Sequence, residues 1–318
     1  MKPVADEHEK KTVTAFGEVL WDLLPSGAVL GGAPLNFAYR VHSLGDTALM
    51  VSRIGRDDLG RQAHEAVAEL GLGTSQLQWD DEAPTGTVQV SFDARNNPDY
   101  VIVPDVAYDR IALTEALARS VEGVDCLCFG TLAQRAPISR ATLTVLLERA
   151  AGTLRLLDIN LRKDCYDEDS VLFSLKEASV LKCNEDEVHA LGEMLRIRHE
   201  PIATFCEAVV QRYALRYCLV TLGERGAFGL SDRDERAYVP GYRVDVADSL
   251  GAGDAFTAGF VHKVLRGAAL TEAIAFGNVL GAIVATQTGA TTPIAPGGIE
   301  AFLRQDVPQR FHPEFGKG

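Results

Sequence analysis

The chain has 318 residues and carries 31 basic against 44 acidic side chains, so its formal net charge is −13. This length suits one large α/β domain or two small ones, and the 47% hydrophobic fraction supplies a sizeable core without disulfide bonds. The acidic balance argues against a nucleic-acid-binding surface, which needs a basic patch.

The sequence also bears on the compartment. Six cysteines form no CxxC pair and no histidine cluster completes a zinc pattern, which is typical of a reducing environment. Residues 1–11 are polar and lack the apolar core of a secretory signal. The apolar segment 268–288 contains Glu272, Asn278 and Gln287, which favours a buried helix over a membrane span. We therefore expect a cytoplasmic protein without a membrane or nucleic-acid partner.

The hydrophobic pattern alternates between strand and helix periods along the chain. In the first half it predicts a strand at 13–20, a helix at 32–44, a strand at 48–54, a helix at 60–70, and a hairpin of 87–92 and 100–103 around the polar turn 95–99. No helix follows either hairpin strand, so we expect the hairpin to lie outside the main alternation.

The second half continues the alternation. It predicts strands at 124–130, 154–159, 180–183, 217–221 and 227–230, and helices at 139–151, 171–176, 186–195, 204–213, 253–265 and 271–286. Repeated strand–helix units imply a mostly parallel sheet covered on both faces. Ligands of such sheets bind at the carboxyl ends of the strands, so the loops that follow strands carry the functional information.

The sharpest motif is DSLGAGDAF at 248–256, where two glycines lead directly into a predicted helix. Free N–H groups of Gly251, Ala252 and Gly253 at that helix start suit an anion such as phosphate. Asp254 beside them is placed to accept a proton from an attacking hydroxyl, as phosphoryl transfer requires. The same residues also fit a tight turn with a helix-start aspartate, and the spacing alone leaves both interpretations open.

A second glycine pair stands at another helix start, in GGAPLN at 31–36. Gly31 and Gly32 allow close approach to the backbone, Asn36 lies off the apolar stripe of the helix, and Asp22 follows the first predicted strand. A carboxylate and an amide in that arrangement are suited to the hydroxyl groups of a sugar. Taken alone, ordinary N-terminal helix chemistry explains the segment more simply.

Polar residues follow two further predicted strands. Arg162, in the segment DINLR at 158–162, is either a cation for a transferring phosphoryl group or a surface salt-bridge partner. Asn184 and Glu187 have the spacing of a capping box, and they also suit an indirect magnesium site, since Mg²⁺ often keeps its water ligands. Both interpretations of this pair can hold together.

The turn after strand 217–221 contains Thr221, Gly223 and Gly226, and it is either a nucleotide-lining turn or, more simply, a hairpin. Asn278 lies inside an apolar helix, as a satisfied core amide or as a nucleotide contact. The chain lacks the P-loop motif GxxxxGK[ST], the protein-kinase motifs HRD and DFG, and a GxGxxG after the first strand. The last absence argues against an NAD-dependent oxidoreductase.

In this order and spacing, the segments resemble the ribokinase-like (PfkB) carbohydrate kinase family over residues 14–296. Both signature regions of the family are present, at 31–55 and 248–260. Several segments are most similar to bacterial fructokinases: GEVLWDLLP at 17–25, GGAPLNFA at 31–38, PTGTV at 84–88, FGTLAQR at 129–135, DINLR at 158–162 and GAT at 289–291.

The resemblance implies a three-layer α/β/α fold with a mostly parallel central sheet, forming a single kinase domain over residues 1–318. A small β-sheet lid is expected from about 24–30 and 85–107, and the family often forms homodimers through it. The implied activity transfers the γ-phosphate of ATP, with Mg²⁺ and in many relatives K⁺, to the 6-hydroxyl of D-fructose. The alternatives are a kinase for 2-keto-3-deoxygluconate, ribose or a nucleoside, and a non-catalytic sugar sensor on the same scaffold.

Residue by residue, the resemblance makes Asp254 the catalytic base and Arg162 a cation near the transferred phosphoryl group. The remaining matched positions are the anion hole of Gly251, Ala252 and Gly253, and the sugar-binding residues Asp22, Gly31, Gly32 and Asn36. On the nucleotide side they are the magnesium-associated Asn184 and Glu187, the nucleotide-lining Thr221, Gly223, Gly226 and Asn278, and Asp248 at a monovalent-cation site.

The chain departs from the family pattern in three places. The usual DTT or DTV opening is Asp248-Ser249-Leu250, in which Leu250 supplies only a carbonyl, so potassium activation stays open. Tyr108 stands where close fructokinase relatives often carry tryptophan, and the turn 93–99 is polar. Because lid residues shape the sugar pocket, these positions bear on which sugar is the substrate.

Overall fold

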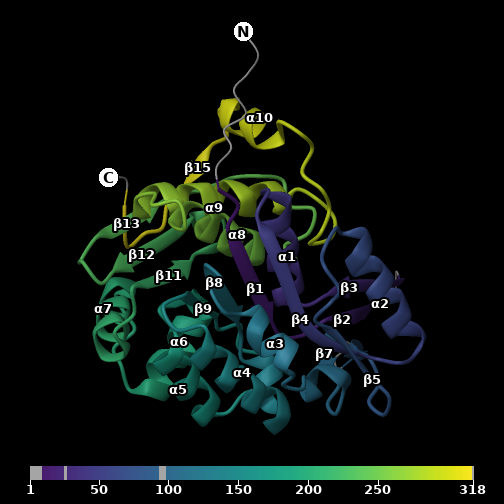
Figure 1. The fold of residues 1–318 in the computed structure, drawn as a ribbon. Helices are drawn as coiled ribbons and strands as arrows, with labels where there is room; N and C mark the ends of the chain where they lie inside the picture. The colour runs from purple at the N-terminus through teal and green to yellow at the C-terminus, as the bar shows by residue number, and fades with distance from the viewer. Residues whose placement is uncertain (1–8, 25–26, 93–97, 317–318) are drawn as a thin grey trace.

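The computed structural model describes residues 9–24, 27–92 and 98–316, and a nine-stranded sheet forms its centre (Figure 1). The strands lie in the order β13-β12-β11-β10-β9-β8-β1-β4-β5. Their bounds are β1 Thr12–Phe16, β4 Thr47–Gly55, β5 Leu77–Asp80, β8 Cys126–Phe129, β9 Leu154–Asp158, β10 Val180–Asn184, β11 Tyr217–Thr221, β12 Ala227–Ser231 and β13 Arg236–Val239. All ladders from β11 to β5 are parallel, whereas β12 and β13 are added antiparallel at one edge.

Helices cover both faces of this sheet. Side chains of α1, α2, α8 and α9 pack in one hydrophobic cluster, and those of α3 to α7 pack in another on the opposite face. The bounds are α1 Ala33–Ser43, α2 Asp58–Glu69, α3 Glu115–Ser120, α4 Pro137–Arg149, α5 Glu168–Glu177, α6 Glu185–Leu195, α7 Ile202–Tyr213, α8 Ala252–Val264, α9 Leu270–Ala285 and α10 Gly298–Arg304. The predicted three-layer α/β/α fold with a mostly parallel sheet is confirmed.

The strands read as continuous apolar runs because both of their faces are buried. In β8, Cys126 and Cys128 pack with α1 and α8, while the alternate residues Leu127 and Phe129 pack with the helices of the other layer. The loops at the carboxyl ends of these strands are therefore held by a core on both sides.

A separate four-stranded sheet lies beside the main one, in the order β3-β2-β6-β7. Its strands are β2 Leu20–Leu24, β3 Gly27–Gly31, β6 Gly86–Phe92 and β7 Pro98–Ile102. The predicted hairpin is confirmed as β6 and β7, which pair antiparallel outside the main sheet. Residues 25–26 of the expected lid and residues 93–97 of its polar turn lie outside the described residues.

The single strand predicted at 13–20 is wrong. β1 ends at Phe16, and Leu20 begins β2, which pairs with β3 and β6 in the lid sheet. Val19, in the connection, is completely buried, so the apolar pattern runs on through the point where the chain changes sheets. Periodicity could not reveal this break, although Gly17, with a φ of 152°, stands at it.

Several short elements were not predicted: β5, β13, α3 and the two-stranded pair of β14 Gly241–Tyr242 with β15 Gln309–Arg310. Each has six residues or fewer, too few for a periodic pattern. The long apolar helix is α9, and no helix among the described residues is long and apolar enough to cross a membrane. All six cysteines are free and buried.

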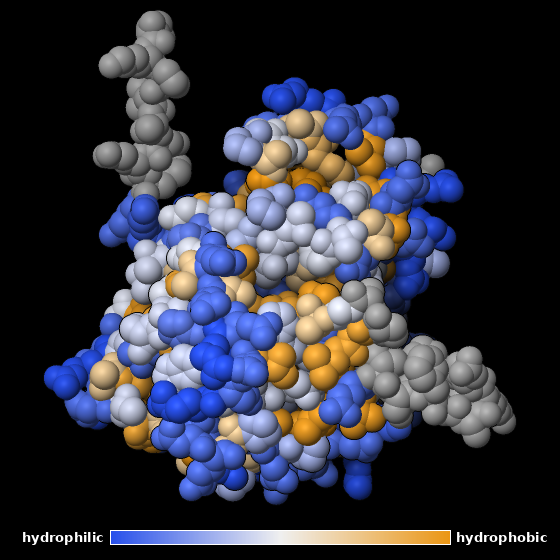
Figure 2. All heavy atoms as spheres, turned by 90° about the vertical axis from the view of Figure 1, so that its right-hand side faces the viewer, coloured by the Kyte–Doolittle hydropathy of each residue, from blue (hydrophilic) through white to orange (hydrophobic). Residues whose placement is uncertain are grey.

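Figure 2 views the molecule from the side of α2 and the lid sheet. Hydrophilic residues cover most of this face, and apolar residues gather near its middle. Val101, on the outer lid strand β7, is 44% exposed.

Candidate active site

The starts of α1 and α8 meet at one end of the main sheet. Asn36 Nδ2 in α1 donates a hydrogen bond of 2.9 Å to Asp254 Oδ2 in the first turn of α8, across 218 residues of sequence. The structure therefore brings together the two helix starts that the sequence singled out separately.

Only glycine fits at the N-cap of α8. Gly251 has a φ of 77°, and a Cβ there would lie 2.4 Å from Cβ of Ala290. The loop that carries Ala290 is fixed in turn by Arg40 of α1, whose buried Nη2 donates to Ala290 O at 2.7 Å and Thr292 O at 2.8 Å. The start of α8 is thus held in place from behind, and the Ala252 N–H of its first turn donates to Ser249 O at 3.3 Å.

Asp254 is a carboxyl with a perturbed pKa. Burial and the nearby charge of Asp158 raise its pKa to about 6, while the Asn36 hydrogen bond and the cations Lys182 and Arg162 act in the opposite direction. A group with this pKa is ionised at neutral pH and remains basic enough to accept a proton.

Asp22, Gly31 and Gly32 lie near this pair on the lid side. Asp22 is on β2, and a Cβ on Gly31 would come within 2.7 Å of Asp22 Oδ2, so the carboxylate lies against the glycine backbone. Burial raises the pKa of Asp22, and the positive charge of Arg162 acts in the opposite direction. Arg162 itself is exposed and has no ion-pair partner among the described residues, so of its two interpretations the surface salt bridge is not observed.

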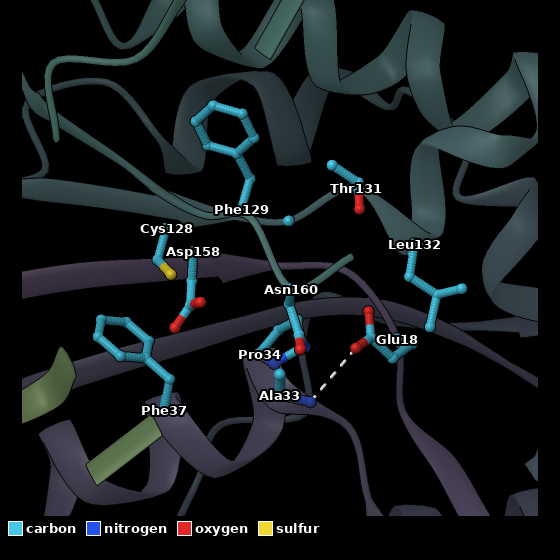
Figure 3. A pocket seen from close by; sticks show the side chains of 11 residues that line it. Glu18, Ala33, Pro34, Phe37, Cys128, Phe129, Thr131, Leu132, Asp158 and Asn160 are labelled. Atoms are coloured by element: carbon cyan, nitrogen blue, oxygen red, sulfur yellow. Dashed lines mark hydrogen bonds between the residues drawn. The ribbon is translucent and has the colours of Figure 1, made fainter. Parts of the chain in front are cut away.

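A small cavity of about 20 Å³ lies between Glu18, the start of α1 and the ends of β8 and β9 (Figure 3). Glu18 and Asn160 point toward each other across it, and Glu18 Oε1 accepts the Ala33 N–H at 3.2 Å. The cavity has room for about one water molecule but not for a sugar. Burial raises the pKa of Glu18 to about 7, so this carboxyl is sensitive to its surroundings in the neutral range.

A buried ion pair underlies the start of α8. Lys182 Nζ donates to Asp158 Oδ1 at 3.1 Å, and Thr257 Oγ1 of α8 donates to Asp158 Oδ2 at 3.0 Å. Lys182 and Asp158 are register partners on β10 and β9, so their side chains project from the same face of the sheet.

A larger cleft of about 310 Å³ opens on the other side of α8. Its polar lining includes Asn184, Thr221, Gly223, Gly226 and Asn278, and its apolar lining includes the side chains Tyr242, Val244, Val246 and Phe256. This volume and mixed lining are typical of a small-molecule site. Gly253 lies on the wall of this cleft, so the cleft reaches the helix start that carries Asp254.

The hairpin turn and the core amide are both observed in the structure, and the residues of both motifs also border the cleft. Thr221, Gly223 and Gly226 form the turn of the β11–β12 hairpin and also line the cleft. Asn278 Nδ2 donates to Val239 O at 3.0 Å, so its amide is satisfied in the core while it also borders the cleft.

The candidate metal-associated residues use their oxygens within the protein. Asn184 and Glu187 form the predicted capping box, and the two Glu187 oxygens accept the N–H groups of Asn184 and Leu161 at 2.8 and 3.0 Å. Asp248 Oδ1 and Oδ2 accept the N–H groups of Leu250 and Gly289 at 2.9 and 3.2 Å. Among the described residues no group of three or more His, Cys, Asp or Glu side chains could hold a metal ion.

Comparison with known proteins identifies the relatives of this chain. Residues 27–296 match the model of the pfkB family of carbohydrate kinases. The chain belongs to this family.

Curated relatives and solved structures show what else this chain is similar to. Fructokinase-1 of Oryza sativa subsp. japonica is 27% identical, over 91% of this chain and 95% of its own length, and the fructokinase of Salmonella typhimurium is 27% identical over 89% and 95%. The crystal structure of a fructokinase with bound ATP from Xylella fastidiosa matches 93% of this chain and 98% of its own with a TM-score of 0.80. At 22% identity this last likeness shows the shared fold.

Within this pfkB-family chain, sequence reasoning missed three side chains of the site. Lys182 interrupts the apolar strand sequence VLKCN, and a lone lysine in a buried strand was the available signal. Glu18 follows directly after Gly17, the first residue beyond β1, and Asp158 was noted only as part of the DINLR segment. Tyr108 is fully buried in the 3₁₀ turn Ala107–Arg110, where its hydroxyl accepts a hydrogen bond from Arg135 at 2.9 Å.

Proposed function

We propose that this carbohydrate kinase transfers the γ-phosphate of ATP to the 6-hydroxyl of D-fructose. The observation that carries the proposal is the contact of Asn36 with Asp254 at the start of α8, between the lid side of the site and the 310 Å³ cleft. The names of the curated plant and bacterial relatives support fructose as the sugar.

The proposed reaction is an in-line displacement. The fructose O6 forms a bond to the γ-phosphorus as the bond from that phosphorus to the β,γ-bridging oxygen breaks, and its electron pair leaves with ADP. Asp254 accepts the hydroxyl proton, and its pKa of about 6 suits this role at neutral pH. The N–H groups of Gly251, Ala252 and Gly253, together with Arg162, would stabilise the charge on the transferring group.

The sugar would bind between α1 and the lid sheet. Asp22 and Asn36 would accept and donate hydrogen bonds to its hydroxyls, with Gly31 and Gly32 allowing close approach. Closure of the lid over the sugar would exclude water and limit hydrolysis of ATP. The lid also has outer strands, β3 and β7, through which we propose that two copies associate.

The nucleotide would occupy the cleft lined by Thr221, Gly223, Gly226 and Asn278. Mg²⁺ on the phosphates neutralises their charge, and Glu187 would reach it through water, since both of its oxygens already accept backbone N–H groups. Asp248, an oxygen donor on the loop before α8, would hold K⁺ if the enzyme uses one.

The decisive experiment measures ADP release by the purified protein with MgATP against fructose, 2-keto-3-deoxygluconate, ribose and a nucleoside, with and without potassium. Fructose should give the highest kcat/KM. The matched variant Asp254→Asn should lose at least about a thousandfold in kcat while still binding the sugar, because only the proton acceptor is removed.

Each outcome has a defined meaning. Turnover of another substrate would contradict fructose and keep the kinase assignment. Thermal stabilisation by sugar without ADP release would favour a sensor on this scaffold. A near wild-type rate for Asp254→Asn would contradict the assignment of the base.

A further inference from the structure

Lys182 is a buried cation to which the phosphoryl-transfer chemistry assigns no role. Its side chain is 9% exposed, and among the described residues its only hydrogen-bond acceptor is Asp158. A Cβ added to Gly253 would lie 3.3 Å from Lys182 Nζ, so the ammonium lies directly against the backbone of the α8 start. A buried ion pair is weak evidence of stabilisation by itself, because desolvation offsets the attraction between the charges.

The ion pair places one negative and one positive charge near Asp254, and these two charges shift the pKa of Asp254 in opposite directions. Asp158 raises the pKa of Asp254, whereas Lys182 lowers it. The other groups that face Asp254 are Asn36 from α1, which donates a hydrogen bond, and Arg162 from the loop after β9. Glu18, after β1, is coupled to the same carboxyl by charge.

The alignment of this pair is fixed by the fold. Asp158 and Lys182 are cross-strand neighbours, and Thr257, one turn after Gly253 in α8, anchors the second oxygen of Asp158. Thr257 Oγ1 also lies 2.9 Å from Gly253 O, so its single hydroxyl proton is shared between Asp158 and the backbone of the helix start. The ammonium is therefore held through Asp158, which is itself fixed by its register with β10 and by its hydrogen bond to Thr257 of α8.

We propose that Lys182 is a positioning residue of the active site, whose ammonium, held by Asp158 behind Gly253, keeps Asp254 in the ionised form that accepts a proton. This inference rests on the proposed function of Asp254 as the base. It also extends that function, because Lys182, which is not among the proposed substrate-binding residues, would help to set the pH above which Asp254 can accept a proton.

The test compares single-charge variants by the titration of Asp254. In Lys182→Met the carboxyl should titrate about 1 pH unit higher than in the wild type, and in Asp158→Asn it should titrate lower. Lys182→Arg should restore the wild-type value, since it returns the charge. Lys263→Met, which removes a partly exposed lysine of the same helix α8, should change nothing.

Two readouts keep this test separate from the proposed function. The ¹³C carboxyl resonance of Asp254, assigned by its loss in Asp254→Asn, reports its ionisation without any turnover. The acidic limb of the pH profile of kcat/KM should move in the same directions, and Glu18→Gln distinguishes that limb from the titration of Glu18. An inactive wild type would contradict the proposed function and leave the resonance to test Lys182.

The titration of Asp254 should shift in opposite directions in Lys182→Met and Asp158→Asn. This excludes a merely structural effect, because a general loosening of the site would shift the titration in the same direction in both variants. If Lys182→Met does not fold, Asp158→Asn alone decides, since asparagine still offers an oxygen to the lysine. Equal titration of Asp254 in the wild type, Lys182→Met and Asp158→Asn would overturn the proposal, as would a shift of Asp158→Asn to higher pH.

Discussion

Asp46 shows how a single buried carboxylate joins distant parts of this chain. His262 Nδ1 in the last turn of α8 and Arg266 just after this helix contact its oxygens at 2.7 and 2.6 Å, and the Lys11 N–H donates to it at 3.0 Å. Burial would raise the pKa of Asp46, but the hydrogen bonds from His262 and Arg266 outweigh it and hold the pKa well below its usual range. The carboxylate links the start of β1, the α1–β4 connection and the end of α8.

Replacing this carboxylate should destabilise the protein. We expect Asp46→Asn to lower the free energy of unfolding by about 3 kcal/mol at pH 7, because it leaves the partly buried guanidinium of Arg266 without its carboxylate partner. The folded-state pKa is lowered, so the contribution is present above the unfolded pKa of about 3.9 and is lost as the pH falls below it.

Urea unfolding of the wild type and Asp46→Asn between pH 3 and 8 measures this difference. Glu272→Gln is the control, since it breaks the more exposed pair with Lys263 and should cost less than about 1 kcal/mol. A difference between Asp46→Asn and wild type that stays constant below pH 4 would contradict the argument.

At the scale of the element, α8 and α10 begin in the same way with different surroundings. Gly251 and Gly297 are their N-caps, with φ of 77° and 74°. A Cβ at Gly251 would collide with Ala290, whereas a Cβ at Gly297 meets no atom within 4 Å. Alanine at either glycine introduces backbone strain, but only alanine at Gly251 also pushes against a neighbouring residue and displaces the helix start. Comparing the two variants therefore separates these effects.

We expect Gly251→Ala to lower kcat about 100-fold, the effect of losing one well-placed donor from an anion hole. Gly297→Ala should cost about 1–2 kcal/mol of stability through left-handed strain and leave kcat unchanged. Steady-state kinetics and thermal unfolding of both variants check this. Equal losses of kcat in the two variants would contradict a specific role of the α8 start in catalysis.

Element prediction from sequence succeeded where a pattern was long and failed where the chain changed sheets. The apolar stripe of Leu35, Ala38 and Val41 predicted α1 to within one residue at each end. The strand at 13–20 failed because the buried Val19 continues the pattern of β1 into the lid strand β2. Which sheet a strand joins depends on distant partners, here β3 and β6, and these leave no local signal.

The site was predictable in its residue types but not in its contacts. Asp254 and Asn36 were each found by their place at a helix start, yet their 2.9 Å contact spans 218 residues. Lys182 was missed because its partner, Asp158, is identified only by the register of β9 and β10. The register between strands brings these two side chains together, and a single sequence carries no local signal for that register.

At the scale of the whole molecule, the reactivity of the six buried cysteines measures how often the protein unfolds. All are free, and burial raises the pKa of Cys126, Cys128 and Cys206, which disfavours the reactive thiolate. We expect no fast-reacting native thiol toward a disulfide reagent such as DTNB, and six upon unfolding in guanidinium.

The exposed variant Ser75→Cys is the positive control, which should react at once in the native state. The slow native reaction should follow the unfolding equilibrium, so that Asp46→Asn accelerates it. A wild-type thiol that reacts within seconds would show that part of the core opens locally.

The contact of Arg40 with the loop at Ala290 and Thr292 has a consequence for how the chain is made. These partners are 250 and 252 residues apart, so at about 5–20 residues per second they are synthesised roughly 12–50 s apart. Throughout that time α1 is out of the ribosome while its partner helix α8 and the loop behind Gly251 are not. A nascent chain that stops before residue 290 therefore never forms the contact that holds the loop behind Gly251.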